Sequence, residues 1–193
     1  MNAKAERKER SHETILESAG RLLREKGISG ARVAEVMLGA GLTVGGFYAH
    51  FESKEALVDE TLRRTGESLR ARLYARLEEK PEADRVTVIL KRYLSGTHRD
   101  EYARGCPLPA VIGEVATTAP QHREVLEEQI EMMSSELAAY LPAGSTVTPR
   151  HLALGLVALM VGGLSLSRAL RGTPLSDEVL KACRAVGTLA AKR

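Results

Sequence analysis

Residues 41–57, which read GLTVGGFYAHFESKEAL, bring together groups that can bind an anion. Ser53 is a good cap for a helix that begins at Lys54, and Glu55 in its first turn favours the helix dipole. The first backbone N–H groups of such a helix have no partner within the helix. Lys54 and these N–H groups together form a candidate anion site.

The segment just before this helix contains two adjacent glycines. The spacing of its apolar residues predicts a short helix over residues 43–50. Gly45 and Gly46 lie inside it, although each glycine costs a helix about 1 kcal/mol relative to Ala. The pair suits a helix whose main chain has to come close to another molecule.

Ring side chains cluster around this glycine pair, in a chain that has only two Phe and five Tyr residues. They are Phe47, Tyr48, His50 and Phe51. Val44, Phe47 and Phe51 stand at positions i, i+3 and i+7, and this spacing predicts a stripe that faces inward. The other side chains of the segment lie elsewhere on the helix.

Three short helices position these side chains. Apolar residues at helical spacing predict helices over residues 11–26, 30–38 and 43–50. The last two have the spacing of a helix-turn-helix, and the first supplies the apolar face that both need. The third helix keeps one face free for a DNA major groove. Early in it, the Thr43 hydroxyl can bond a base edge, and Val44 can contact a thymine methyl group.

The rest of the chain also predicts helices and no strands, because no run alternates apolar and polar residues. Further helices are expected over residues 54–79, 83–98, 107–117, 120–140, 149–171 and 175–191. The fold class is therefore all-α with about nine helices. A small N-terminal helical module, residues 1–53, is joined by a long fourth helix to a larger helical bundle, residues 54–193. The charged residues 1–10 are expected to be a frayed arm.

Composition excludes several classes of protein. The net charge of +3 is too small to indicate nucleic acid by itself. There is no apolar leader at the N-terminus, and the most apolar window, residues 152–166, is short for a membrane span of about 20 residues. No HExxH, GxSxG or P-loop motif is present, and the five histidines are scattered. We expect a cytoplasmic protein that is not an enzyme and has no catalytic residues, metal, cofactor or membrane contact.

Residues 41–57 resemble the DNA-binding region of the tetracycline-repressor-like (TetR) family of bacterial regulators. The matching positions are Gly41, Leu42, Thr43, Phe47, Tyr48, His50, Phe51, Ser53, Lys54, Glu55 and Leu57. The resemblance covers residues 10–60. It implies a repressor that binds a palindromic DNA operator as a homodimer and is released by a small-molecule effector.

The resemblance also implies the residues that contact DNA. They are Arg32, Thr43, Val44, Gly45, Gly46, Tyr48, His50 and Lys54. Tyr48 and His50 are expected to contact phosphates. Arg32 departs from the family, which has a hydroxyl residue just before Val33. We expect Arg32 to replace that hydroxyl's phosphate contact and Ser29 to cap the second helix.

In the family, the effector pocket lies among the middle helices, and the last two helices form the dimer. The expected pocket residues are Ile89, Tyr93, Cys106, Leu108, Ile112, Met132, Met133 and Met160. The expected dimer residues are Gly155, Leu159, Gly162, Gly163, Val179 and Val186. Small residues permit close approach of helices, and methionines suit an adaptable apolar pocket.

Two interpretations of Cys106 remain open. It stands directly before a predicted helix start and two residues after Arg104, and both features favour a reactive thiolate. The alternative function is therefore a thiol-based regulator, or a redox protein, that responds to oxidants or electrophiles. The other interpretation is a small buried side chain that fills the mouth of the pocket.

Overall fold

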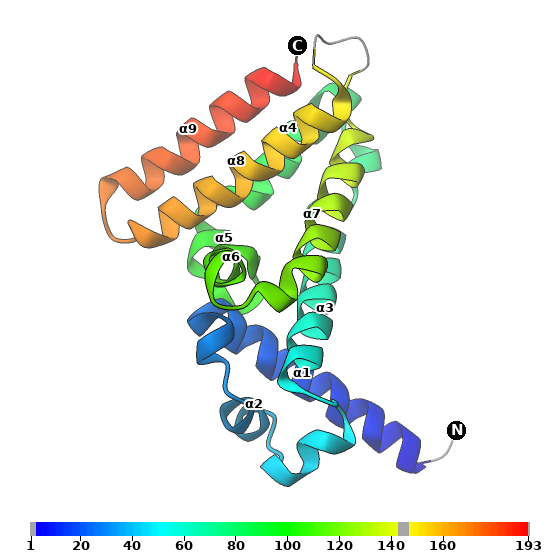
Figure 1. Cartoon of the computed structure of the whole chain (residues 1–193). Coiled ribbons are helices and arrows are strands. Elements are labelled where there is room, and N and C mark those ends of the chain that lie inside the picture. Colours follow the sequence, from blue (N-terminus) through cyan, green and yellow to red (C-terminus); the bar gives the residue numbers. More distant parts are fainter. Residues whose placement is uncertain (1–2, 143–146, 193) are drawn as a thin grey trace. The chain divides into compact units, whose positions relative to one another are not determined.

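This computed structural model describes residues 3–142 and 147–192, and the regular elements in these two ranges are all helices (Figure 1). The α-helices are α1 (Ala3–Gly30), α2 (Val33–Gly39), α3 (Lys54–Tyr74), α4 (Glu82–Tyr93), α5 (Gly96–Asp100), α6 (Leu108–Thr117), α7 (Arg123–Ala138), α8 (Pro149–Ala169) and α9 (Pro174–Ala191). Short 3-10 helices are η1 (Val44–Ala49), η2 (Leu77–Glu79), η3 (Tyr102–Arg104) and η4 (Pro120–His122). No strand occurs in these two ranges, which confirms the predicted all-α class.

The described residues form two compact units. The first comprises residues 3–67 and 106–126, and the second comprises residues 68–105, 127–142 and 147–192. Helix α6 therefore belongs with the predicted DNA-binding helices, although it lies far from them in the sequence. The division of functions between residues 1–53 and 54–193 stays a prediction.

The core of the first unit forms where α1 packs against α2 and α6. The apolar stripe predicted for the first helix is confirmed as buried, and it consists of Ile15, Leu16, Ala19, Leu22 and Leu23. Val111 and Val115 are buried on α6. The imidazole of His122, which is also buried, makes a 2.6 Å contact between Nδ1 and Oδ1 of Asp59 on α3. These contacts hold α6 and η4 to the helices that carry the DNA-binding motif.

The predicted start of the first helix at residue 11 and the frayed arm expected before it are wrong, whereas the predicted end at residue 26 agrees with a break in the helix at Gly27. Residues 3–10 are helical, so α1 begins eight residues before the predicted start at residue 11, and Met1 and Asn2 lie outside the described residues. At its other end α1 bends at Gly27, where φ is +71°. That conformation is accessible to glycine at little cost, so the chain turns there and continues as far as Gly30.

In the second unit, α8 and α9 run side by side, and α4 packs against α9 (Figure 1). Within the described residues, α8 is the one helix that is long and apolar enough to cross a membrane. Its buried positions account for much of that apolar character, because residues such as Leu156, Met160 and Leu164 pack inside the unit. The fourth helix, α3, ends at Tyr74 and not at the predicted residue 79, because Arg76 adopts a left-handed conformation with φ 56°.

Candidate functional site

The helix-turn-helix consists of α2, a short turn and η1. Gly41 forms the turn with φ +70°, and its N–H donates to the carbonyl of Leu38 at 3.0 Å. The N–H of Leu42 donates to the carbonyl of Met37 at 2.9 Å. Thr43 is extended and begins the second helix, as predicted, but its side chain makes no capping hydrogen bond. The two helices pack directly against each other.

The second helix of this motif is a 3-10 helix, where the sequence predicted an ordinary helix. The N–H of Gly46 donates to the backbone carbonyl of Thr43 at 3.0 Å, and the N–H of His50 donates to the backbone carbonyl of Phe47 at 2.9 Å. These bonds reach back three residues, which defines the 3-10 form. Glycines weaken the α-helical alternative, and Gly45 has no neighbouring atom within 4 Å of where a Cβ would lie.

Phe47 and Phe51 hold η1 to the unit, as predicted. Phe47 is 1% exposed, and its ring stacks on that of Phe51 with centroids 5.7 Å apart. The prediction that Val44 belongs to the same inward stripe is wrong, because Val44 is 52% exposed at the open start of η1. The other role predicted for Val44, contact with a base edge, requires this exposure.

The start of η1 is exposed, whereas Phe47 within it and Phe51 just after it are buried. Thr43, Val44 and Gly45 are exposed, and Gly46 is half-buried above Met37. The phenol of Tyr48 is 77% exposed and meets the edge of Phe47. This arrangement leaves side chains and main chain available to a partner over the first half of η1.

His50 lies at the end of η1 and is half-buried. Its Nδ1 atom is buried and has no hydrogen-bond partner among the described residues. Burial lowers the pKa of His50, and the neighbouring His12 and Lys8 lower it further. The ring of His12 lies 5.8 Å away and makes a 2.5 Å contact with the carboxylate of Glu60. The ring of His50 is therefore kept neutral more readily than an ordinary histidine.

Lys54 is the predicted phosphate-binding residue at the start of α3. The prediction that Ser53 caps this helix is confirmed, because its hydroxyl accepts a hydrogen bond from the N–H of Ala56 at 3.1 Å. Lys54 itself is half-buried, and its amine donates to the carbonyl of Ile28 at 2.8 Å. Its charge therefore also anchors the end of α1.

Arg32 and Ser29 differ from their predicted arrangement. Arg32 is exposed and is itself the residue that precedes α2, where it makes no side-chain cap. Ser29 does not cap α2, which corrects the prediction. Its hydroxyl and its N–H both donate to the carboxylate of Glu114 on α6, the N–H at 2.8 Å.

Glu114 is a residue that sequence reasoning missed. Besides Ser29, it accepts a hydrogen bond from the N–H of Ile28 at 2.6 Å. Burial by itself raises the pKa of Glu114, but the hydrogen bonds from Ser29 and Ile28 and the nearby Lys54 outweigh it and leave the pKa below its usual value. No local sequence pattern indicated this contact, because Ser29 and Glu114 are 85 positions apart in the chain.

The eight residues predicted for the effector pocket are spread over both compact units. Cys106, Leu108 and Ile112 belong to the first unit, and the other five belong to the second. Most are buried, but Met132 is 38% exposed. None lines either of the two cavities described below, so their role in a pocket stays a prediction.

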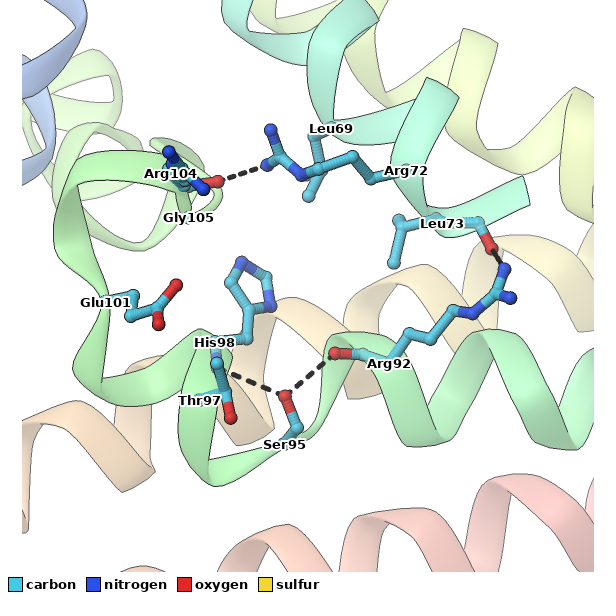
Figure 2. A pocket seen from close by; sticks show the side chains of 10 residues that line it. All are labelled: Leu69, Arg72, Leu73, Arg92, Ser95, Thr97, His98, Glu101, Arg104 and Gly105. Atoms are coloured by element: carbon cyan, nitrogen blue, oxygen red, sulfur yellow. Dashed lines mark hydrogen bonds between the residues drawn. The ribbon is translucent and has the colours of Figure 1, made fainter. Parts of the chain in front are cut away.

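Both cavities lie within the second unit. One has a volume of about 430 Å³ and is lined by Leu69, Arg72, Leu73, Arg92, Ser95, Thr97, His98, Glu101, Arg104 and Gly105 (Figure 2). The other has a volume of about 700 Å³ and is lined by Glu82, Ala83, Arg85, Val86, Ala139, Tyr140, Leu141, Pro142, Ala191 and Lys192. The first is rich in arginine, which the prediction of an apolar pocket did not anticipate.

The residues predicted for the dimer divide into open and covered positions. Gly155 and Gly162 on α8 have no atom within 4 Å of where a Cβ would lie, and Val186 on α9 is exposed. Leu159 and Val179 are half-buried. Gly163 packs inside the chain, because a Cβ there would lie 2.7 Å from Sγ of Cys183. Gly163 therefore belongs to the contact between α8 and α9 of one chain.

The thiol of Cys106 is 1% exposed. This burial fits the interpretation of a structural side chain better than that of a thiol open to oxidants. Within residues 3–142 and 147–192, no group of three or more His, Cys, Asp or Glu side chains is arranged to hold a metal ion.

Two family profiles match the chain. The profile described as "Bacterial regulatory proteins, tetR family" matches residues 15–61. The profile described as "Tetracyclin repressor-like, C-terminal domain" matches residues 82–183, which is more than half of the chain.

Curated relatives match over a short stretch. The HTH-type transcriptional repressor KstR2 of Mycobacterium tuberculosis is 43% identical over 49 residues, which are 25% of this chain and 24% of that protein. The repressor of the same name from Rhodococcus jostii is 41% identical over 49 residues, with the same coverage. The matched stretch thus spans about a quarter of the length of each relative.

Solved structures match over nearly the whole chain. A TetR transcriptional regulator from Chloroflexus aurantiacus has a TM-score of 0.80 and 23% identity, and the match covers 95% of both chains. A putative TetR-family regulator from Rhodococcus sp. has a TM-score of 0.79 and 18% identity, over 95% of this chain and 99% of that one. At these identities the likeness shows the fold.

Proposed function

Because the chain belongs to the tetR family of bacterial regulatory proteins, we propose that it is a transcriptional repressor released from DNA by a small-molecule effector. It binds a palindromic operator in double-stranded DNA as a homodimer. On this proposal the chain is not an enzyme, uses no cofactor or metal, acts in the cytoplasm and contacts no membrane. The curated relatives that match 49 residues of this chain are named repressors, which supports this direction of regulation.

The observation that carries the proposal is the exposed start of η1 on its buried support. Thr43 and Val44 are exposed while Phe47 beneath them is buried. A soluble protein gains nothing in stability from an apolar side chain left half in water, whereas a DNA reader uses it against a thymine methyl group. On this proposal Tyr48, whose phenol is exposed, binds a phosphate.

The proposed reading mechanism uses few direct base contacts. Neither Thr43 nor Val44 can make the paired hydrogen bonds with a base that Arg or Gln makes. Gly45 and Gly46 allow the main chain itself to come close to the groove. Part of the sequence preference therefore comes from the shape and deformability of the DNA.

Dimerisation is proposed through α8 and α9. Gly155 and Gly162 leave the face of α8 open, and Leu166 on the same helix is exposed. On α9, Val186 and Leu189 are exposed at a spacing of three residues, which places them on one face. Two copies that bury these faces carry two η1 segments related by a twofold axis, and this symmetry matches a palindromic operator.

Release by an effector requires that the effector binds the DNA-bound and DNA-free conformations with different affinities. Helix α6 is a candidate element for this coupling, because Glu114 fixes the backbone at Ile28 and Ser29, immediately before α2. A movement of α6 along or away from α1 changes these hydrogen bonds and therefore the position of α2.

The test is a binding titration with DNA from upstream of the chain's own gene, followed by fluorescence anisotropy at several salt concentrations. We expect binding that is selective for sequence and weakens with salt. Thr43→Ala is expected to change the preferred sequence, whereas Thr117→Ala, an exposed threonine on α6, is the matched control. Binding that shows no sequence selectivity and no salt dependence rejects the proposal.

A further inference from the structure

The arginine-lined cavity of the second unit has the chemistry of an anion site. Its guanidinium groups come from three separate segments: Arg72 from α3, Arg92 from α4 and Arg104 from η3. Figure 2 shows the ring of His98 between Arg92 and the segment that carries Arg104. The volume of about 430 Å³ is sufficient for a small organic molecule.

The chain balances only part of the positive charge of the cavity. Within the described residues, none of these three arginines forms an ion pair with a carboxylate. Their hydrogen bonds go to backbone carbonyls: Arg72 donates to the carbonyl of Arg104, and Arg92 donates to those of Leu73 and Ala75 at 2.6 and 2.8 Å. Carbonyl groups orient a guanidinium but do not cancel its charge.

Other arginines of the same unit do have carboxylate partners. Arg99 binds Asp100 at 2.9 Å and Asp177 at 2.6 Å, and Arg70 binds Glu136 at 3.1 Å. The chain therefore supplies carboxylates to nearby arginines outside the cavity. The one carboxylate among the cavity's lining residues is that of Glu101, against three guanidinium groups.

The electrostatic environment of Arg72 agrees with this imbalance. Burial lowers the pKa of Arg72, and the positive charge of Arg104 lowers it further. Glu101 raises it, but with a smaller effect than either. An anion bound beside Arg72 and Arg104 would remove this repulsion between like charges.

The remaining lining residues indicate what else the ligand carries. Leu69 and Leu73, both buried, contribute an apolar wall. Ser95 is already committed, because its hydroxyl accepts from the N–H of His98 at 3.1 Å and donates to the carbonyl of Arg92 at 3.0 Å. The site is thus cationic on one side and apolar on another.

We propose that this cavity binds a small organic anion, with its carboxylate or phosphate group between Arg72 and Arg104 and a short apolar chain against Leu69 and Leu73. A planar guanidinium fork matches the oxygens of either anionic group. In the proposed repressor, this anion is the effector. That last role rests on the proposed function, whereas binding in the cavity does not.

The experiment measures ligand affinity by calorimetry on the full-length chain. The probes are hexanoate, hexyl phosphate and the neutral hexanamide, which keeps the apolar chain and removes the charge. We expect at least one of the two anions to bind and hexanamide to bind at least about tenfold more weakly. The tighter of the two anions identifies the ionic group. Equal binding of all three probes, or binding of neither anion, overturns the proposal.

A variant locates the binding. Arg104→Gln keeps the backbone carbonyl that Arg72 uses, so it removes charge without removing that hydrogen bond. We expect it to weaken binding of the anion about tenfold or more. Arg85→Gln is the control, because Arg85 lines the other cavity and also donates to a backbone carbonyl, that of Lys80. Equal affinities of Arg104→Gln and the unmodified chain contradict the assignment.

A separate titration distinguishes the site from the regulatory role. If the anion binds the cavity and weakens DNA binding, both proposals are supported. If the anion binds and DNA affinity does not change, the anion site stands and its role as effector is rejected. If the chain binds no DNA at all, the proposed function fails, while the calorimetry still decides the anion site.

Discussion

The carboxylate of Glu114 on α6 holds the N–H of Ser29 at 2.8 Å, immediately before the helix-turn-helix. Gly27 leaves room for this contact, because a side chain at that position would overlap the carboxylate of Glu114. Lys54 donates to the carbonyl of Ile28 in the same turn. The last turn of α1 is therefore fixed by charged side chains from two other helices, α6 and α3.

Glu114→Gln is expected to destabilise the chain by about 1–2 kcal/mol, because a neutral amide accepts these hydrogen bonds more weakly. The folded chain lowers the pKa of Glu114, so the contribution is present above the ordinary value of about 4.3 and is lost as the pH falls through the folded value. Urea unfolding at neutral and acidic pH should show the difference from the unmodified chain narrowing in acid. The exposed Glu127 provides the control Glu127→Gln. A difference that is constant with pH contradicts this account.

His50 is expected to make folding stability fall as the pH is lowered. Because its pKa is lowered in the folded chain, the unfolded chain binds the proton first as the pH falls below about 6.5. The charged or titratable groups around it are His12, Lys8 and, through His12, Glu60. His50→Gln should flatten the dependence of unfolding free energy on pH between 7 and 5.5, measured by urea titration. His151→Gln, at an exposed histidine, should leave the slope unchanged, and identical slopes for His50→Gln and the unmodified chain would show that the histidine is not involved.

Tyr48→Phe is expected to weaken binding to all DNA sequences about fivefold, because one phosphate hydrogen bond of about 1 kcal/mol is lost. The ring's contact with Phe47 is kept, and the hydroxyl belongs to a side chain that is 77% exposed. Thermal unfolding should therefore not change. Anisotropy titrations on specific and scrambled DNA measure the effect, with Tyr140→Phe as the control from the second unit. A loss confined to the specific sequence would assign Tyr48 to base reading.

Val186→Glu is expected to separate the proposed dimer into monomers. A carboxylate on the exposed apolar face of α9 would be buried opposite its own copy in a twofold interface, which costs several kcal/mol. Light scattering after size-exclusion chromatography measures the mass. Leu38→Glu places the same charge at an exposed leucine of α2 and should leave the mass unchanged. A monomeric unmodified chain, or a dimeric Val186→Glu variant, contradicts the interface.

The sequence predicted those parts of the molecule that depend on local periodicity. Phe47 and Phe51 are buried and Ser53 caps α3, because side-chain spacing and capping chemistry act within a few residues. The 3-10 form of η1 depends on how the glycine pair shifts a close balance between two helical forms, and no apolar pattern records that balance.

The parts that could not be predicted depend on residues distant in sequence. Glu114 and Ser29 are separated by 85 positions, and neither belongs to a recognisable motif. The cationic cavity combines Arg72, Arg92 and Arg104 from three segments, and nothing in the sequence around any one of them indicates that the three lie together. Only the folded chain shows that the carboxylates pair elsewhere.

If η1 reads DNA as proposed, its 3-10 form changes the length of the segment that faces the groove. A 3-10 helix rises about 2.0 Å per residue and an α-helix about 1.5 Å. The six residues of η1 therefore advance about 12 Å, where an α-helix would advance about 9 Å. The difference of about 3 Å is close to the spacing of about 3.4 Å between neighbouring base pairs along the duplex. The six residues of η1, which include two glycines, are therefore longer as a 3-10 helix than they would be as an α-helix.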